Sequence, residues 1–187
     1  FGYEIADDVR KNLITLWNTY SFFVTYANLD GFDPKKYSLD DVQLSTLDKW
    51  ILAKMNQFID STNLHYENFE VFKLMKLSSN LLDDISNWYV RRNRRRFWKS
   101  ENDADKVGAY LTLYTVLVDY TKIMSPVIPF VSEKIYENLV LNIDKNTVSS
   151  IHLTDFPSIN KKFVNPDLVE CVDSIKAIVS LGRSARN

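Results

Sequence analysis

The sequence predicts an all-α fold: a bundle of about six helices, with a short irregular or extended segment before the last helix. Only four Gly and five Pro occur in 187 residues, which is too few for a turn-rich β-sandwich or barrel. Apolar residues recur at steps of three and four over most of the chain, as on the buried face of a helix. Because 45% of the residues are hydrophobic, the chain can bury one sizeable core.

The first two helices are separated by a loop. The first is predicted to end near Asn28, and its apolar stripe consists of Ile5, Val9, Leu13, Leu16, Tyr20, Phe23 and Ala27. A segment rich in Asp, Gly and Pro follows. Ser45 and Asp48 have the spacing of a capping box, so the second helix is expected to begin there and to break around residues 63–65. Trp17, near the first stripe, and Trp88 are expected in the core.

The third helix is expected to run directly into a cluster of arginines. Its apolar face consists of Leu74, Leu77, Leu81, Ile85 and Trp88. A fourth helix, capped by Asn102 or Asp103, should end before Pro126, and Pro129 suits the first turn of a fifth.

The end of the chain predicts a different organisation. Residues 141–165 lose periodicity, although Val148, Ile151 and Leu153 could form a short extended piece, and a last helix should start at Asn165. We therefore divide the chain into a helical bundle at 1–140 and a segment at 141–187 that leads into a further C-terminal region.

The composition also excludes several functions. No apolar run is long enough for a membrane span, and the single Cys171, expected to be buried, fits a cytoplasmic protein. His65 and His152 lie far apart without other ligands at metal-binding spacing, and the glycines form no phosphate-binding loop. We predict no catalytic residue and no metal site. The absent initiator Met and the end at Asn187, inside a helical pattern, suggest a longer parent chain.

Basic residues are concentrated in one short segment, although the formal net charge is only −1. The cluster consists of Arg91, Arg92, Arg94, Arg95, Arg96 and Lys99. With about 100° per residue, the arginines overlap the direction of the preceding apolar face, so the helix end is expected to protrude beyond its neighbours. Guanidinium groups bind phosphate and stack on bases, and Trp98 adds an aromatic surface, which together favour RNA binding.

Two alternatives for the basic residues stay open. The arginines could instead be solvated or paired with nearby acids, for which the candidates are Asp83, Asp84, Glu101 and Asp103. Near the end of the chain, Arg183 and Arg186 are candidates for additional RNA contacts or for contacts with another domain.

The segment Asn87-Trp88-Tyr89-Val90-Arg91-Arg92-Asn93-Arg94-Arg95-Arg96-Phe97-Trp98 resembles the anticodon-binding domain of isoleucyl-tRNA synthetases, which are class I synthetases. The resemblance is to the eukaryote-like type in particular, which is also found in some bacteria. Further segments resemble the same domain in the same order: Leu16-Trp17-Asn18-Thr19-Tyr20-Ser21-Phe22-Phe23, Leu47-Asp48-Lys49-Trp50-Ile51-Leu52, Met124-Ser125-Pro126-Val127-Ile128-Pro129-Phe130, His152-Leu153-Thr154-Asp155-Phe156-Pro157 and Leu181-Gly182-Arg183-Ser184-Ala185-Arg186-Asn187. The resemblance covers nearly the whole chain.

This resemblance implies a helical bundle that binds the anticodon stem-loop of the isoleucine tRNA. The parent enzyme would be a monomeric ligase that uses ATP and Mg²⁺, and its catalytic and C-terminal domains would adjoin this one. The family's activation motifs and its editing domain do not occur here, so no cofactor is expected in this fragment. Valyl or leucyl enzymes, a stand-alone helical RNA-binding module and a protein-binding module remain alternatives.

Overall fold

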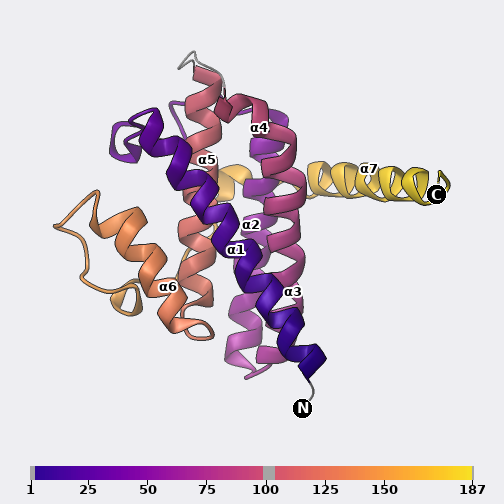
Figure 1. Cartoon of the computed structure of the whole chain (residues 1–187), viewed down its shortest axis with the longest axis horizontal. Coiled ribbons are helices and arrows are strands. Elements are labelled where there is room, and N and C mark those ends of the chain that lie inside the picture. The colour runs from indigo at the N-terminus through magenta and orange to yellow at the C-terminus, as the bar shows by residue number, and fades with distance from the viewer. Residues whose placement is uncertain (1–2, 99–103, 187) are drawn as a thin grey trace.

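The computed structural model describes residues 3–98 and 104–186, and within these ranges it is helical without a β-strand. Figure 1 shows a bundle from which one helix projects as an arm. The helices and π-helical segments are α1 (Tyr3–Leu29), α2 (Thr46–Glu67), α3 (Val71–Asp83), the π-helical η2 (Asp84–Val90), α4 (Arg91–Trp98), α5 (Ala104–Met124), α6 (Pro129–Tyr136), the π-helical η3 (Glu137–Leu141) and α7 (Pro166–Ser184). Because α3, η2 and α4 run on without a break, as do α6 and η3, the prediction of about six helices is confirmed.

Three predicted helix starts are confirmed, because each depends on local chemistry: a cap hydrogen bond at α2 and α7, and a proline at α6. At α2, the Ser45 amide donates to Asp48 Oδ2 at 2.7 Å, and the Asp48 amide donates to Ser45 Oγ at 3.2 Å, which completes the capping box. Pro129 occupies the first turn of α6. At α7, the Leu168 amide donates to Asn165 Oδ1 at 3.0 Å. The predicted break at 63–65 is wrong, since α2 continues to Glu67.

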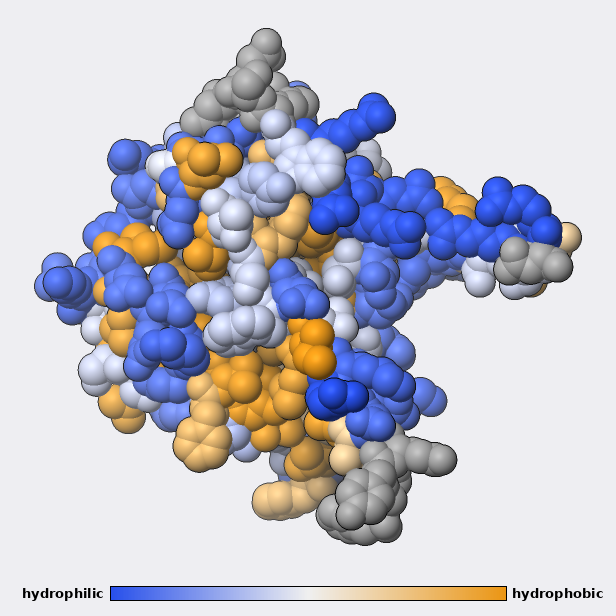
Figure 2. Space-filling view, viewed as in Figure 1, coloured by the Kyte–Doolittle hydropathy of each residue, from blue (hydrophilic) through white to orange (hydrophobic). Residues whose placement is uncertain are grey.

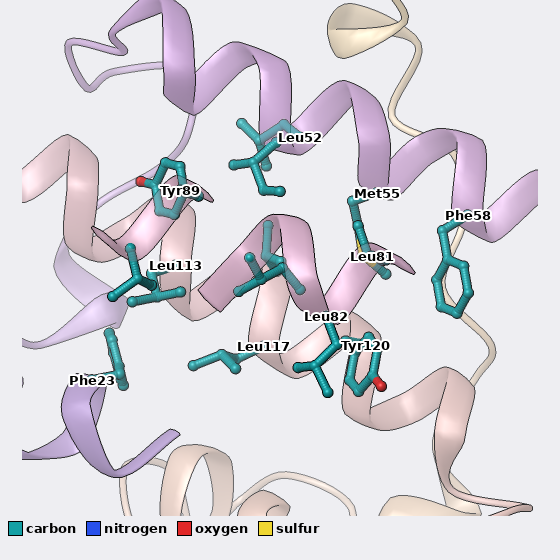
Figure 3. Close-up of a cluster of buried hydrophobic side chains, with 14 of the residues drawn as sticks. Phe23, Leu52, Met55, Phe58, Leu81, Leu82, Tyr89, Leu113, Leu117 and Tyr120 are labelled. Atoms are coloured by element: carbon teal, nitrogen blue, oxygen red, sulfur yellow. The ribbon is translucent and has the colours of Figure 1, made fainter. Parts of the chain in front are cut away.

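The core lies where α2, α5 and the α3–η2–α4 helix pack on one another. Figure 3 shows Leu52, Leu81, Tyr89, Leu113 and Leu117 converging from these helices. Each fully buried large apolar side chain contributes about 1.5–3 kcal/mol relative to exposure. The rigid core therefore fixes the direction in which the next turn, α4, presents its side chains.

The α4 end of the third helix differs from the sequence prediction. Phe97 is 1% exposed, and its ring packs edge-on against Phe22 at 5.2 Å and Tyr110 at 5.1 Å. The helix therefore stays packed to its last turn, and the predicted protrusion is wrong. The physical reason is the π-helix η2. A π-helix has more residues in each turn than an α-helix, so side-chain directions that are counted at a constant 100° per residue are wrong beyond Asp84–Val90.

The segment between η3 and α7 is irregular, as expected, but Ile151 and Leu153 do not lie in an extended piece. It forms two 3-10 turns, Ile151–Leu153 and Lys161–Phe163. Glu133 accepts hydrogen bonds from Ser150 Oγ at 2.9 Å and from the Ile151 amide at 3.1 Å. The Asn56 side chain exchanges two hydrogen bonds with the Asn160 backbone, at 2.8 and 3.0 Å. Side chains thus satisfy the hydrogen-bonding groups of the Ile151 and Asn160 backbone, so this segment needs no neighbouring strand to pair with.

Only the first turns of α7 pack on the bundle. Val169 and Val172 are buried, whereas Ile178 and Leu181 are 67% and 71% exposed. In Figure 1 the helix extends away from α3 and α4, and its C-terminal end lies far from the bundle. Cys171 on α7 is exposed, so its predicted burial is wrong.

The predicted core position of Trp17 is also wrong. Its side chain is 42% exposed, and its ring lies 5.1 Å from that of Tyr20. The tryptophan therefore lies at the margin of the core instead of inside it. Separately, none of the described helices combines the length and the apolarity needed to cross a membrane.

Candidate nucleic-acid interface

The eight residues of α4 divide into an inward and an outward set. Asn93, Arg96 and Phe97 are buried. Asn93 Nδ2 donates to the Tyr89 carbonyl oxygen at 2.9 Å, which ties this turn to η2. The remaining side chains are exposed, and we refer to them as the α4 basic face: Arg91, Arg92, Arg94, Arg95 and Trp98.

Arg96 does not belong to this face, which corrects the sequence prediction. Arg96 is only 9% exposed. Its two terminal nitrogens donate hydrogen bonds to Asp48 Oδ1 and Oδ2, each at 2.8 Å. Nη2 also lies 2.9 Å from Asp105 Oδ1. A bidentate pair with a buried carboxylate is short and strong, and it orients both partners. The guanidinium therefore joins α4 to α2 and α5, and it is not available to a ligand.

Asp48 is the centre of this buried network. It is 0% exposed, and besides Arg96 it accepts from the Tyr89 hydroxyl at 2.6 Å and from the Ser45 amide. Burial lowers the pKa of Arg96, but the hydrogen bond and charge of Asp48 outweigh burial and raise it. Burial, followed by the Asp48 charge, raises the pKa of Tyr89 well above its usual value. Tyr89 is thus a neutral donor and Arg96 a permanent cation.

Aromatic rings orient two arginines of the α4 basic face. The Arg92 guanidinium carbon lies 4.2 Å from the centre of the Trp88 ring. That of Arg94 lies 4.9 Å from the Trp98 ring and 5.9 Å from the Phe22 ring. Such cation–π contacts contribute roughly 0.5–1 kcal/mol each at exposed sites. They restrict side chains that would otherwise sample many rotamers.

The acid-pairing alternative can be tested at two of its four candidate carboxylates. Asp84 is 2% exposed and pairs with Lys54 at 3.3 Å and with Lys176, and Asp83 accepts from Asn87 at 2.6 Å. Neither contacts an arginine of the α4 basic face. Within residues 3–98 and 104–186, no carboxylate forms an ion pair with that face. Glu101 and Asp103, like the candidate Lys99, lie outside the described residues.

The remaining candidates lie apart from α4. Arg183 and Arg186 are exposed near the end of α7. Figure 2 shows hydrophilic side chains both beside the α4 end of the bundle and along the α7 arm.

His65 Nδ1 lies 3.1 Å from Glu70 Oε2, and the described residues bring together no group of three or more potential metal ligands.

Sequence reasoning missed two parts of this site. Phe22 contacts Arg94 from a helix 72 positions earlier in the chain, and Asp48 neutralises Arg96 across 48 positions. No local pattern reports contacts at such separations. The Trp88–Arg92 and Arg94–Trp98 pairs, in contrast, have the i,i+4 spacing of neighbours on a helix, and that signal could have found them.

Comparison with known families decides the relationship. The family described as "Anticodon-binding domain of tRNA ligase" matches residues 48–187, which include the whole of α4. The chain belongs to this family. Its relatives include the isoleucine–tRNA ligases of Clostridium novyi, Clostridium kluyveri and Dehalococcoides mccartyi (strain CBDB1), which are 45%, 46% and 45% identical to it over 98% of its length.

These relatives are much longer than the anticodon-binding domain described here. The chain spans 18% of the length of each of the three. It is therefore homologous to one domain of an isoleucine–tRNA ligase. The α4 basic face lies within the matched part of that domain.

Proposed function

We propose that this domain binds the anticodon stem-loop of an isoleucine tRNA through the α4 basic face. The observation that carries the proposal is the exposure of four arginines on one helix, none of them ion-paired with a carboxylate among the described residues. Four neighbouring cations repel one another, and a polyanion relieves that repulsion. Membership of the anticodon-binding family makes tRNA the polyanion of choice over an acidic protein.

The chemistry of the face suits a folded RNA loop. Arginine's planar group binds phosphate with two parallel hydrogen bonds, and Trp98, which is 52% exposed, offers a ring on which an unpaired base can stack. Sequence-specific RNA recognition mostly targets unpaired loops, because their bases can leave the stack. An anticodon loop offers both backbone phosphates and unpaired bases.

The parent chain, we propose, is a monomeric cytoplasmic ligase that joins isoleucine to its tRNA with ATP and Mg²⁺. This domain supplies RNA contacts and no catalytic group, and it requires no cofactor of its own. Residues 141–187 connect the bundle at 1–140 to a C-terminal domain, so Arg183 and Arg186 contact either that domain or the RNA. The names of the relatives given above do not distinguish the eukaryote-like type, which stays a prediction from the sequence motif.

The test uses the full-length ligase that contains this domain. Replacing all four exposed arginines with alanine should lower tRNA affinity and reduce the slope of log affinity against log salt by about 0.7–0.9 for each of them that contacts a phosphate. A charge-matched control replaces four exposed lysines outside α4 that form no ion pair with the described residues: Lys49, Lys76, Lys145 and Lys161. The control should leave the slope nearly unchanged.

Equal effects of the two quadruple variants would reject the α4 basic face as the RNA site. Comparing charging of the isoleucine and valine tRNAs separates an isoleucine-specific parent from the other class I enzymes. A pull-down performed without RNA, with bound proteins identified by mass spectrometry, tests the protein-binding alternative. Recovery of a stoichiometric acidic partner on wild type, but not on the arginine variant, would favour that alternative.

A further inference from the structure

The four exposed arginines of α4 are of two physical kinds. Arg92 and Arg94 lie over aromatic rings, at 4.2 Å from Trp88 and 4.9 Å from Trp98. Arg91 and Arg95 make no hydrogen bond, ion pair or ring contact with any residue that the structure describes. Two guanidinium planes are therefore oriented before any ligand binds, whereas two are free to rotate.

The two kinds occupy different places around the helix. With about 100° per residue along α4, the outward side chains follow one another around the axis in the order Arg94, Trp98, Arg91, Arg95, Arg92. The free pair, Arg91 and Arg95, is spaced i,i+4 and forms a central row. One ring-held arginine lies on each side of this row. Trp98 accompanies Arg94 on one side, and Trp88 supports Arg92 on the other.

Two of the three supporting rings, Trp88 and Phe22, are themselves held by the bundle. Trp88 is half-buried, and its indole Nε1 is enclosed by protein atoms. Phe22, which also contacts Arg94, packs against the buried Phe97 at 5.2 Å. A guanidinium plane on a fixed ring keeps a constant direction, which recognition of a base edge or a base plane requires. A phosphate, as a charged and nearly symmetrical group, can be bound by a mobile side chain.

From this geometry we infer a division of roles, which rests on the proposed function of the α4 basic face. Arg91 and Arg95 bind backbone phosphates along the middle of the face. Arg92, Arg94 and Trp98 bind unpaired bases that turn to either side of that backbone. The central pair thus supplies affinity that is independent of sequence, and the flanking groups supply discrimination among loop sequences.

Lysine substitutions separate the two roles because they keep the charge and remove the plane. In the full-length ligase, Arg92→Lys with Arg94→Lys should reduce the preference for the isoleucine tRNA over the same tRNA with substituted anticodon-loop bases. The expected loss is roughly 5- to 150-fold per lost base contact, with an unchanged salt slope. Arg91→Lys with Arg95→Lys is the matched control and should keep the preference.

Two further variants complete the test. Arg91→Ala with Arg95→Ala should lower the salt slope by roughly 1.5 and weaken all loop sequences equally. Trp98→Leu, which changes no charge, should lower the preference without changing the slope. Circular dichroism verifies that each variant keeps the helical content of wild type.

The outcomes distinguish the inference from the proposed function. If the two lysine variants lose the preference equally, or both keep it, the division of roles is wrong while RNA binding by the face can still stand. If the quadruple alanine variant binds tRNA like wild type, the proposed function fails and the division fails with it. Loss of preference confined to the Arg92 and Arg94 variant, with the slope change confined to Arg91 and Arg95, supports both.

Discussion

Arg96→Ala tests the assignment of one arginine of the cluster to the interior. The substitution removes the guanidinium that binds both oxygens of Asp48 at 2.8 Å, and it leaves that carboxylate 0% exposed and without its ionic partner. Breaking a buried ion pair by removing one partner costs about 3–5 kcal/mol. We expect a loss of this size in the free energy of unfolding.

The size of this loss depends on the hydrogen bonds that Asp48 still accepts after the substitution. It retains the Tyr89 hydroxyl at 2.6 Å and the Ser45 amide at 2.7 Å, so the carboxylate is not left wholly unsatisfied. These two hydrogen bonds place the expected value near the lower end of the range. Even about 3 kcal/mol is a large part of the 5–15 kcal/mol that usually stabilises a domain.

Urea denaturation of the 187-residue chain, followed by circular dichroism, measures the effect. Arg95→Ala is the matched control, since the neighbouring side chain is of the same type but exposed. Its free energy of unfolding should lie within about 0.5 kcal/mol of wild type. If Arg96→Ala were as mild as Arg95→Ala, Arg96 would be a surface cation and the buried network described above would be refuted.

Three other predictions concern separate parts of the fold. Asp119 lines a cleft between α2, α5 and residues 155–163, and burial raises its pKa from 3.8 to about 6. Its stabilising contribution is present below pH 3.8 and is lost as the pH rises through 6, so wild type should lose up to ~3 kcal/mol relative to Asp119→Asn between pH 4 and 7 in urea titrations. A Cβ on Gly108 would lie 2.1 Å from the Gln43 carbonyl oxygen, so Gly108→Ala should destabilise by about 1–3 kcal/mol despite the better helix propensity of alanine, and an unchanged melting temperature would contradict this contact. Ile178→Ser with Leu181→Ser, on the exposed part of α7, should change the unfolding free energy of this chain by less than about 1 kcal/mol, and a larger loss would mean that the arm packs on the bundle.

Local chemistry explains which elements could be predicted from the sequence. The capping box at Ser45, the proline at 129 and the cap at Asn165 each involve residues a few positions apart, and all three helices start as expected. The all-helical class follows from apolar spacing, which is repeated many times along the chain. In both cases the information lies within one element.

The candidate site was only partly predictable, for two physical reasons. Apolar spacing does not reveal where a backbone changes from i+4 to i+5 hydrogen bonding, so the wheel drawn through Asp84–Val90 gave the wrong phase. The burial of Arg96 depends on Asp48, a residue of another helix, and a run of arginines does not indicate which member has such a partner. Tertiary packing alone decides both.

The π-helical segment η2 has a consequence for how this surface can change. The seven residues Asp84–Val90 carry no basic side chain, yet they determine the direction in which every later side chain of the helix points. Deleting one of them would rotate α4 by about 100° relative to α3, which would turn some of the outward side chains inward. Substitutions within α4 can adjust its contacts one at a time, whereas a change of length in η2 would alter all of them together.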